Sequence, residues 1–241
     1  MTVEAPPPPA EPTTPSVTVE APPPPAEPTT PSATVEAPPP PDIDVRPAAY
    51  YDRVYASDSR PNGYRPAWRA IEPRRRRLML RAAEAACPPG RPPPRVLEVG
   101  CGTGQFAELL ASRGVRDYRG FDFSAEAVRQ ARERLPRWAE RIAVADAADP
   151  AAYADANGRL IICMETLEHL ADDRSVVALW PAGVRVVLTV PTFYAHGHVR
   201  VFRSARAVRD RYAGLIALRR VEAIKVAGKG VRWHVASGRR T

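Results

Sequence analysis

A glycine-rich stretch between two apolar segments most limits what this chain can fold into. The apolar segment RVLEV, at 95–99, predicts a short buried strand, and QFAELLAS, at 105–112, predicts a helix that Gly114 ends. The residues between them, GCGTG, allow a sharp turn and leave no Cβ in the way of an approaching ligand. A strand, a glycine turn and a helix in this order are typical of α/β folds that bind nucleotide-like ligands. The glycines of this candidate site are Gly100, Gly102 and Gly104.

Strands and helices alternate along the rest of the chain. Strands are predicted at 95–99, 118–123, 142–145, 160–164, 184–190, 216–224 and 231–236, and helices at 67–86, 105–112, 125–135, 173–179 and 204–212. Ser124 suits the N-cap of the third helix, whereas residues 42–65 are rich in tyrosine but irregular. Such alternation predicts an α/β fold, a Rossmann-like, doubly wound, mostly parallel seven-stranded sheet with an antiparallel edge strand.

A proline-rich repeat precedes this pattern. The unit TVEAPPPPAEPTTPS occurs at 2–16 and 18–32, and its first eight residues recur at 34–41. Proline fixes φ and removes a backbone donor, and the repeat has few large apolar residues to bury, so neither helix nor sheet is expected there. The predicted parts of the chain are a disordered proline-rich tail at 1–45, an N-terminal helical segment at 46–94 and an α/β domain at 95–241.

The folded part of the chain is strongly basic. All 35 lysine and arginine residues lie after residue 41, with 22 of the 27 acidic residues, so residues 42–241 carry a net charge of +13. The arginines are spread along the domain, apart from Arg74–Arg77, and this charge is weak support for a nucleic-acid partner. With three cysteines in no paired spacing, and neither a leader nor an apolar run of about 20 residues, we expect a cytoplasmic protein with no membrane partner. The oligomeric state stays open.

The spacing of the glycines separates the candidate ligands. Dinucleotide sites use G-x-G-x-x-G, but this chain has G-x-G-x-G, with Gln105 in the place of the third dinucleotide glycine. The motif E-V-G-C-G-T-G resembles the first motif of class I S-adenosylmethionine-dependent methyltransferases. By that resemblance, Glu98 lies near the methionine end of the cofactor, Asp122 holds the two ribose hydroxyls, and Asp146 meets the adenine amino group. It implies S-adenosyl-L-methionine as cofactor and a methyltransferase domain at 95–241.

Acidic and histidine side chains follow the fourth predicted strand, in CMETLEHL. Glu165, Glu168 and His169 stand at i, i+3 and i+4, so they share one face if a helical turn begins there. In one hypothesis, Glu165 or His169 orients or deprotonates an acceptor hydroxyl. In the other, these three residues, with His198, bind a divalent metal such as Mg or Mn that lowers the pKa of the hydroxyl. The catalytic candidates are therefore Glu165, His169 and His198, and the candidate metal ligands are Glu165, Glu168, His169 and His198.

The same text resembles several methyltransferase families. The ubiquinone-pathway O-methyltransferases carry nearly the same C-M-E-x-L-E-H string. The metal-dependent enzymes that methylate the 3′-terminal ribose of small RNAs use E-x-x-E-H with a later histidine. The chain is also similar to small bacterial methyltransferase-domain proteins with a YYDRVYAS-like segment, and that similarity implies a lid over the cofactor within 46–94. The lid residues so implied are Tyr50, Tyr51 and Tyr55.

These features predict a methyltransferase that transfers the methyl group of S-adenosylmethionine to an oxygen of a small-molecule acceptor by in-line displacement. Glu165 or His169 would act on the acceptor. Two alternatives stay open. One is metal-assisted 2′-O-methylation of RNA, although no RNA-binding module is visible and RNA is the less favoured partner. The other is a non-catalytic, cofactor-binding scaffold that displays the proline-rich tail.

Overall fold

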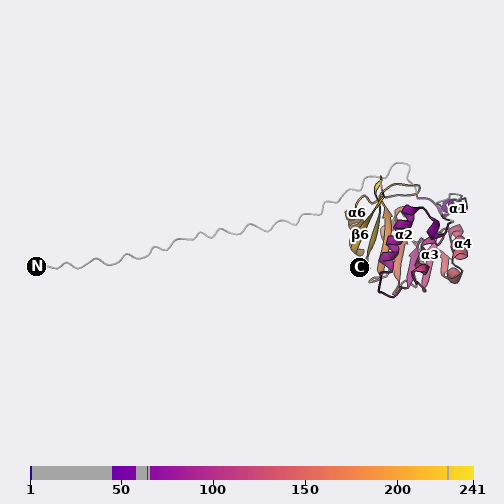
Figure 1. Cartoon of the computed structure of the whole chain (residues 1–241), viewed down its shortest axis with the longest axis horizontal. Coiled ribbons are helices and arrows are strands. Elements are labelled where there is room, and N and C mark those ends of the chain that lie inside the picture. Colours follow the sequence, from indigo (N-terminus) through magenta and orange to yellow (C-terminus); the bar gives the residue numbers. More distant parts are fainter. Residues whose placement is uncertain (2–44, 58–63, 65, 227) are drawn as a thin grey trace. The chain divides into compact units, whose positions relative to one another are not determined.

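A computed structural model describes Met1 and residues 45–57, 64, 66–226 and 228–241. The predicted proline-rich tail lies outside these residues, except for its two ends. The described residues from Val45 onward belong to one compact unit built on a seven-stranded sheet (Figure 1). The strand order is β3-β2-β1-β4-β5-β7-β6, and β1 to β5 run parallel. This order confirms the predicted Rossmann-like, doubly wound fold.

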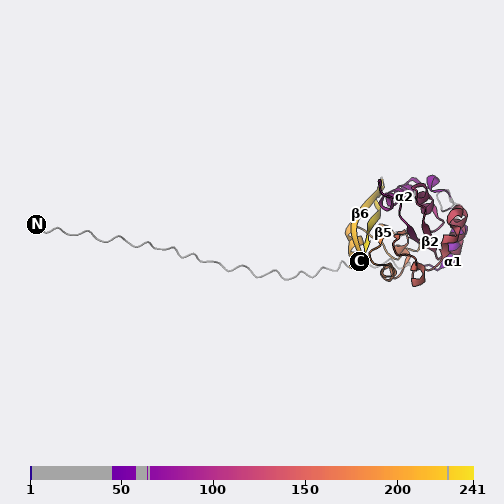
Figure 2. The same ribbon diagram turned by 90° about the horizontal axis from the view of Figure 1, so that it is seen from below.

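The strands lie close to the predicted positions. They are β1 (Val96–Val99), β2 (Tyr118–Asp122), β3 (Ile142–Val144), β4 (Leu160–Met164), β5 (Arg185–Pro191), β6 (Ile216–Val226) and β7 (Gly230–Arg240). The antiparallel part consists of the last two strands: β7 pairs antiparallel with both β5 and the edge strand β6. Figure 2 shows the edge strand β6 and helix α1 (Ala48–Ala56) at opposite sides of the unit.

Helices cover both faces of the sheet. The α-helices after α1 are α2 (Pro73–Ala86), α3 (Gln105–Ser112), α4 (Ala125–Arg134), α5 (Asp173–Ala178) and α6 (Ala205–Arg211). The short 3-10 turns are η1 (Trp68–Ala70), η2 (Pro136–Arg141), η3 (Pro150–Tyr153) and η4 (Leu167–His169). Buried side chains of α2, α3 and α4 pack on one face of the sheet, and those of α5 and α6 pack on the other.

Alternation along the buried strands supplies both apolar layers. In β4, Leu160 and Ile162 belong to the layer under α2 and α3, whereas Ile161 and Cys163 belong to the layer under α5 and α6. Successive side chains of a strand point to opposite faces, so a strand that is buried on both sides is apolar throughout. The sheet is therefore enclosed on both faces, and its open side is the edge where the parallel strands end.

Local signals explain where most helices begin. The hydroxyl of Ser124 accepts a hydrogen bond from the backbone N–H of Ala127 and caps α4, as predicted. The carboxylate of Glu72 caps α2 and Pro73 takes its first position, so α2 begins later than the predicted residue 67. The other difference is α1, a helix inside the segment predicted to be irregular.

Among the described residues, we find no helix with the length and apolar character needed to span a membrane.

Candidate functional site

The carboxyl ends of the parallel strands bring most of the predicted site residues to one edge of the sheet. The glycine turn follows β1, Asp122 ends β2, and Glu165 follows β4. Asp146 lies two residues after β3. Because the strand order is β3-β2-β1-β4, these groups form a row in the order Asp146, Asp122, glycine turn and Glu165. Ligands of doubly wound sheets bind at this edge, where the strand order reverses.

The three glycines of the turn have positive φ angles of 70°, 51° and 77°, in the order Gly100, Gly102 and Gly104. A Cβ on Gly100 would lie 2.3 Å from the Thr166 hydroxyl oxygen, so this glycine allows close contact between two loops. A Cβ on Gly102 would meet only the Tyr55 hydroxyl, at 3.5 Å. The left-handed backbone at these positions explains the need for glycine. The space beside Gly102 is therefore open on the side that faces α1.

Asp122 is held by the backbone on both sides. One carboxylate oxygen accepts a hydrogen bond of 2.9 Å from the N–H of Gly102, and the other accepts one of 3.0 Å from the N–H of Ser124. Burial raises the pKa of Asp122, and these backbone hydrogen bonds act in the opposite direction. Each carboxylate oxygen can accept two hydrogen bonds, so the fixed carboxylate keeps capacity for further donors.

A pocket of about 430 Å³ lies between the chain before α1 and the ends of β2 and β3. Two of its apolar side chains, Phe123 and Val144, are 37% and 53% exposed, which is unusual for large apolar groups in this chain. Asp146 lies beside them, and its carboxylate accepts a hydrogen bond of 2.8 Å from the N–H of Ala148. The pocket offers an apolar surface with a carboxylate at its rim, which suits a flat heterocycle with an amino group.

Glu98 lies deeper than the other predicted cofactor residues. It is 2% exposed on β1, and its carboxylate accepts a hydrogen bond of 2.7 Å from the Tyr118 hydroxyl. Burial raises the pKa of Glu98 to about 8, although the Tyr118 hydroxyl lowers it. The structure therefore places Glu98 in the apolar layer beneath the glycine turn, with its carboxyl bonded to the core.

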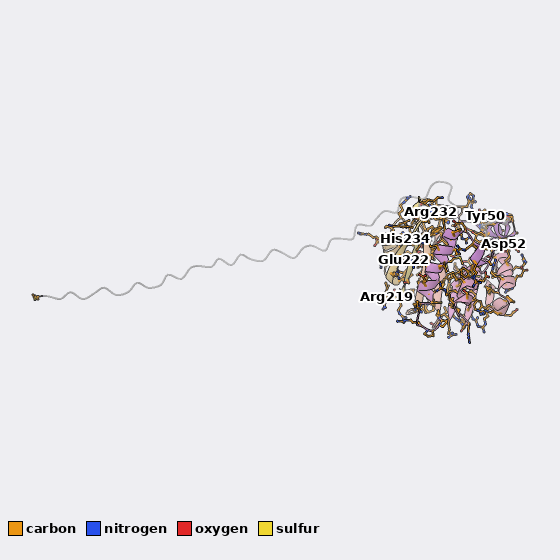
Figure 3. The ribbon with its side chains drawn as sticks, in the orientation of Figure 1. Tyr50, Asp52, Arg219, Glu222, Arg232 and His234 are labelled. Atoms are coloured by element: carbon orange, nitrogen blue, oxygen red, sulfur yellow. The ribbon has the colours of Figure 1, made fainter. Side chains whose placement is uncertain are left out.

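Helix α1 lies across this edge and contacts two parts of the site. Asp52 accepts a hydrogen bond of 2.6 Å from the Ser124 hydroxyl and another, of 3.1 Å, from the N–H of Glu126. The Tyr51 hydroxyl lies 2.9 Å from Nδ1 of His169. One face of α1 is thus joined both to the start of α4 and to the turn after β4, and Figure 3 shows Asp52 and Tyr50 at the upper end of the unit.

Glu165 adopts a backbone conformation that is unusual for a non-glycine residue, with φ of +50°. Its carboxylate accepts a hydrogen bond of 2.9 Å from the Thr189 hydroxyl and one of 2.7 Å from the indole N–H of Trp233. Burial raises the pKa of Glu165 to about 7, whereas these two hydrogen bonds and the charge of Arg75 lower it. A left-handed backbone costs about 1–2 kcal/mol for such a residue, and strain of this kind concentrates at functional sites.

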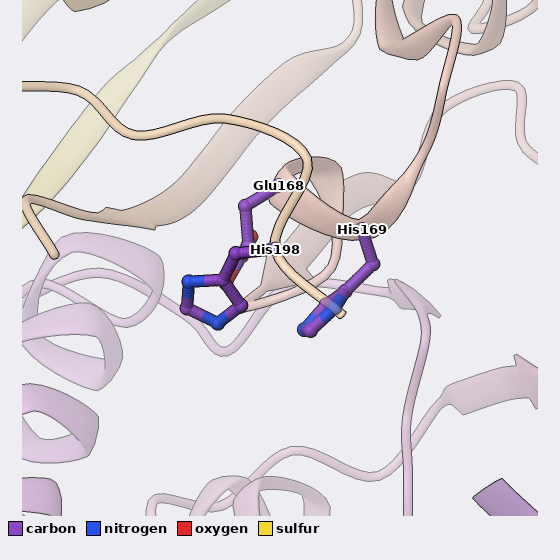
Figure 4. A group of neighbouring side chains, drawn as sticks. All are labelled: Glu168, His169 and His198. Carbon is purple, nitrogen blue, oxygen red and sulfur yellow. The ribbon is translucent and has the colours of Figure 1, made fainter. Parts of the chain in front are cut away.

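Glu168, His169 and His198 form a compact group beside Glu165 (Figure 4). A carboxylate oxygen of Glu168 and a ring nitrogen from each histidine lie within 4.8 Å of one another. Glu168 is fully buried, yet neither of its oxygens has a hydrogen-bond partner in the described part of the chain. Burial raises the pKa of Glu168 well above its usual range. An unpartnered buried carboxylate is costly, so this group suits an added donor or cation.

Backbone carbonyls orient both histidines. Nδ1 of His169 lies 2.9 Å from the Gly197 carbonyl oxygen, and Nδ1 of His198 lies 3.0 Å from that of Phe193. A carbonyl oxygen only accepts, so Nδ1 carries the proton and Nε2 keeps its lone pair in each neutral ring. Burial lowers the pKa of His169 to about 4 and also lowers that of His198. Both rings are therefore neutral at pH 7, with Nε2 available as a base or as a metal ligand.

The buried Arg200 supports the turn that carries Glu168 and His169. Its guanidinium donates hydrogen bonds to the carbonyl oxygens of Leu167, Leu170 and Ala171 and lies 3.4 Å from the Asp173 carboxylate. These bonds satisfy the carbonyls of a short turn that has no ladder partners. The donors of Arg200 are therefore used inside the protein.

The structure thus gathers three of the four predicted metal ligands and leaves the fourth apart. Glu165 lies outside the group of Glu168, His169 and His198, because Thr189 and Trp233 hold its carboxylate. The pattern i, i+3, i+4 had suggested one helical face, but the 3-10 turn η4 begins only at Leu167. Sequence reasoning did not identify Asp52, Thr189 and Trp233, whose hydrogen bonds hold other residues of the site in place. The signals that could have found them were weak: Asp52 is a lone aspartate in a tyrosine-rich segment, and Thr189 and Trp233 are hydrogen-bonding residues within apolar strands.

Comparisons with known proteins agree with this architecture. Residues 96–185 match the family described as "Methyltransferase domain". The ubiquinone biosynthesis O-methyltransferase of Thiobacillus denitrificans is 38% identical over 86 residues, which cover 35% of this chain and 37% of that protein. Its counterpart in Pectobacterium atrosepticum is 40% identical over 87 residues, covering 34% and 35%. The chain therefore spans little more than a third of the length of these curated relatives.

Solved structures share the fold over most of the chain. The N-methyltransferase NodS of Bradyrhizobium japonicum, in complex with S-adenosyl-L-homocysteine, has a TM-score of 0.62 and 19% identity, covering 81% of this chain and 99% of that one. The magnesium protoporphyrin IX methyltransferase of Synechocystis, also with bound S-adenosylhomocysteine, has a TM-score of 0.56 and 15% identity, covering 80% and 94%. The [4+2]-cyclase SpnF matches as well, with a TM-score of 0.58, 17% identity and coverage of 82% and 97%.

These comparisons establish the fold. The chain has the fold of class I S-adenosylmethionine-dependent methyltransferases, and residues 96–185 match the family described as "Methyltransferase domain". The presence of a cyclase among the structures with this fold means that the reaction has to be argued from the site.

Proposed function

We propose that this chain binds S-adenosylmethionine along the edge of the sheet and transfers its methyl group to an oxygen of a small-molecule acceptor. The observation that carries the proposal is the row of groups set by the strand order, from Asp146 through Asp122 and the glycine turn to Glu165. A nucleoside attached to a charged amino-acid chain needs these partners in this order: a carboxylate near adenine, a carboxylate near the ribose and an open backbone turn beyond it.

The local geometry at the first two positions fits the nucleoside. The pocket beside Asp146 has exposed apolar side chains that an adenine ring would cover, Phe123 and Val144. Asp122 is fixed by two backbone donors and accepts two more hydrogen bonds without moving, as the two ribose hydroxyls require. Gly102 leaves room for a ligand to approach the backbone on the side of Tyr55.

The bound cofactor supplies a methyl group on a positively charged sulfur. The protein has to hold an acceptor oxygen in line with that methyl group and take its proton, and alignment of this kind accounts for much of the rate. Glu165 and His169 are the groups beside this position that can take a proton. The pKa of about 7 for Glu165 suits a general base near neutral pH, and Nε2 of His169 is an unprotonated acceptor.

The unpartnered carboxylate of Glu168 supports a metal at this site as a second element of the proposal. Glu168 and the Nε2 atoms of His169 and His198 would hold a divalent cation, and a cation would supply the missing partner of the buried carboxylate. Such an ion would lower the pKa of an acceptor hydroxyl beside it. Glu165 would remain with Thr189 and Trp233 and act on the acceptor directly.

A small molecule is a better acceptor for this site than RNA. Three of the four arginines at Arg74–Arg77 are engaged within the protein: Arg74 pairs with Glu72, Arg76 donates to the carbonyl of Arg69, and Arg77 donates to the carbonyl of Lys225. Arginines engaged in this way are poor candidates for a phosphate-binding track. The partial similarity to ubiquinone biosynthesis O-methyltransferases also supports oxygen of a small molecule as the acceptor.

An assay with labelled S-adenosylmethionine tests the proposal. The protein is incubated with a panel of phenols, catechols and amines, and label is measured in the products. We expect transfer to hydroxyl groups, with little label from Glu165→Gln and normal label from the exposed Asp155→Asn. A protein that binds S-adenosylhomocysteine but transfers no label to any acceptor would favour the non-catalytic scaffold.

A further inference from the structure

Two separate segments of the chain meet in the group of Glu168, His169 and His198. The first two residues belong to η4, whereas His198 lies in the connection between β5 and α6, which passes beside that turn (Figure 4). A turn and a loop share neither a strand ladder nor a helix, so other contacts must fix them relative to each other. Those contacts determine whether the three candidate ligand atoms stand within 4.8 Å of one another.

Arg200 makes most of these contacts. Its guanidinium, which follows His198 closely in the chain, donates hydrogen bonds to backbone carbonyls on both sides of Glu168 and His169. The accepting carbonyls are those of Leu167, at 2.8 Å, Leu170, and Ala171, at 2.7 Å. Beside it, the N–H of Val199 donates to the carbonyl of Glu168 at 2.8 Å. These hydrogen bonds join the loop that carries His198 to the turn that carries Glu168 and His169.

The carboxylate of Asp173 holds Arg200 in this position. Asp173 and Arg200 are 0% and 7% exposed, and a guanidinium nitrogen lies 3.4 Å from a carboxylate oxygen. The Tyr212 hydroxyl donates a hydrogen bond of 2.8 Å to the same carboxylate, and the Arg211 guanidinium donates one of 2.5 Å. Buried charges need partners of this kind. Asp173 begins α5, and the other two donors lie at the end of α6, so two helices fix the orientation of Arg200.

The shape of a guanidinium explains the use of arginine at position 200. Its planar fork presents five N–H donors in fixed directions, so one side chain can bind several carbonyls and a carboxylate at once. A lysine would bring the same charge on a single nitrogen. The Glu168 carboxylate has no hydrogen-bond partner in the described part of the chain, so contacts of its own side chain do not fix its direction. The backbone that Arg200 binds has to do so.

We propose that Arg200 and Asp173 are positioning residues for the group of Glu168, His169 and His198. The pair sets the distance between the loop and the turn, and thereby the affinity of the group for a divalent cation, without touching the cofactor or the acceptor. This inference rests on the proposed function and specifies what assembles that same site. A pair with a purely structural role would change the stability of the fold but leave this affinity unchanged in every variant that folds.

The test is calorimetric titration of Mn²⁺ into the full chain saturated with S-adenosylhomocysteine. Groups that orient metal ligands typically contribute roughly 10–100-fold to metal affinity, so we expect Arg200→Gln to weaken Mn²⁺ binding about tenfold or more. Arg200→Lys should recover only part of the loss, because it keeps the charge beside Asp173 but not the fork. The affinity for S-adenosylhomocysteine should change far less, since Asp122 is held by backbone donors of its own.

Tyr212→Phe is a milder variant that removes one hydrogen bond from Asp173 and keeps the buried ring. We expect it to fold and to weaken Mn²⁺ binding about threefold, since its effect reaches the group only through Asp173 and Arg200. Arg203→Gln is the matched control, because Arg203 is an exposed arginine of the same loop. This control should bind Mn²⁺ like the wild type, and cooperative thermal unfolding of each variant checks that it is folded.

Unchanged Mn²⁺ affinity in Tyr212→Phe and in folded Arg200→Gln would overturn the inference while leaving the proposed function in place. Equal losses of Mn²⁺ and S-adenosylhomocysteine affinity would also overturn it, because they would show a general loss of structure. A wild type that binds S-adenosylhomocysteine but not Mn²⁺ would remove the metal and this inference together. A wild type that binds neither would remove the proposed function itself.

Discussion

The hydroxyl of Tyr51, on α1, lies 2.9 Å from Nδ1 of His169, in the turn after β4. The same nitrogen lies 2.9 Å from the carbonyl oxygen of Gly197. The Nδ1 proton of His169 is therefore shared by a backbone carbonyl and by a residue of the helix that crosses the site. The carbonyl oxygen fixes the tautomer, with Nε2 unprotonated, and the contact with the Tyr51 hydroxyl joins α1 to this candidate catalytic histidine.

Loss of the hydrogen bond between Tyr51 and His169 should loosen the attachment of α1 to the site. We expect Tyr51→Phe to weaken S-adenosylhomocysteine binding about fivefold, since one hydrogen bond contributes about 1 kcal/mol. Calorimetric titration measures the change. The control is Tyr50→Phe: the Tyr50 ring stacks on His196, and its hydroxyl has no hydrogen bond within the described part of the chain. Equal affinities for Tyr51→Phe and the wild type would show that the contact does not hold the helix in place.

Replacement of the buried Glu168 carboxyl should affect stability in opposite directions with and without metal. Without metal, we expect Glu168→Gln to raise the Tm, because the variant removes a buried carboxylate without partners. With Mn²⁺ at about 100 times its Kd, the wild type should gain about 3 kcal/mol and several degrees in Tm, and the variant should gain nothing.

His196→Ala serves as the control for this metal experiment, since His196 is exposed in the same loop as His198 and lies outside the three-residue group. This variant should respond to Mn²⁺ like the wild type. A thermal shift with Mn²⁺ that persists in both Glu168→Gln and His198→Ala would place the ion elsewhere in the protein.

The pH dependence of methyl transfer should report Glu165. A base acts when it is deprotonated, and burial raises the pKa of Glu165 to about 7, so the rate should rise between pH 6 and pH 8. Glu165→Gln should lose this inflection and lower kcat by about 100-fold or more. The profile is measured with the best acceptor of the panel and with the exposed Glu140→Gln as control. An unchanged inflection in Glu165→Gln would assign it to another group.

The buried Glu98 should make stability fall as pH rises. Its folded-state pKa is about 8, above the ordinary value of 4.5, so the unfolded chain ionises first and the folded state loses stability between pH 4.5 and pH 8. Compared with Glu98→Gln, which keeps an oxygen for the Tyr118 hydroxyl, the wild type should lose up to roughly 4 kcal/mol across this window. Urea unfolding of both proteins at several pH values measures the difference, and parallel curves would contradict the prediction.

Local signals in the sequence were sufficient for the fold and for placing the candidate cofactor residues in one row. Apolar runs, Ser124 and Gly114 marked strand and helix limits, and a carboxylate at the end of a parallel strand can face only one edge of the sheet. The orientation of the Glu165 side chain could not be predicted from such local signals. Its carboxylate is held by Thr189 and Trp233, which lie 24 and 68 residues away in the chain. The meeting of Glu168 with His198 depends on loop packing in the same way.

The most direct test of the account is calorimetric titration of S-adenosylhomocysteine into the wild type and two site variants. Asp122→Asn keeps the shape of the residue and one acceptor for its backbone donors, and Asp146→Ala changes an exposed residue at the adenine pocket. We predict saturable binding at one site per chain, weakened about tenfold or more in each variant and unchanged in the exposed control Asp155→Asn. Absence of binding by the folded wild type, or equal binding by all four proteins, would contradict the proposed methyltransferase site.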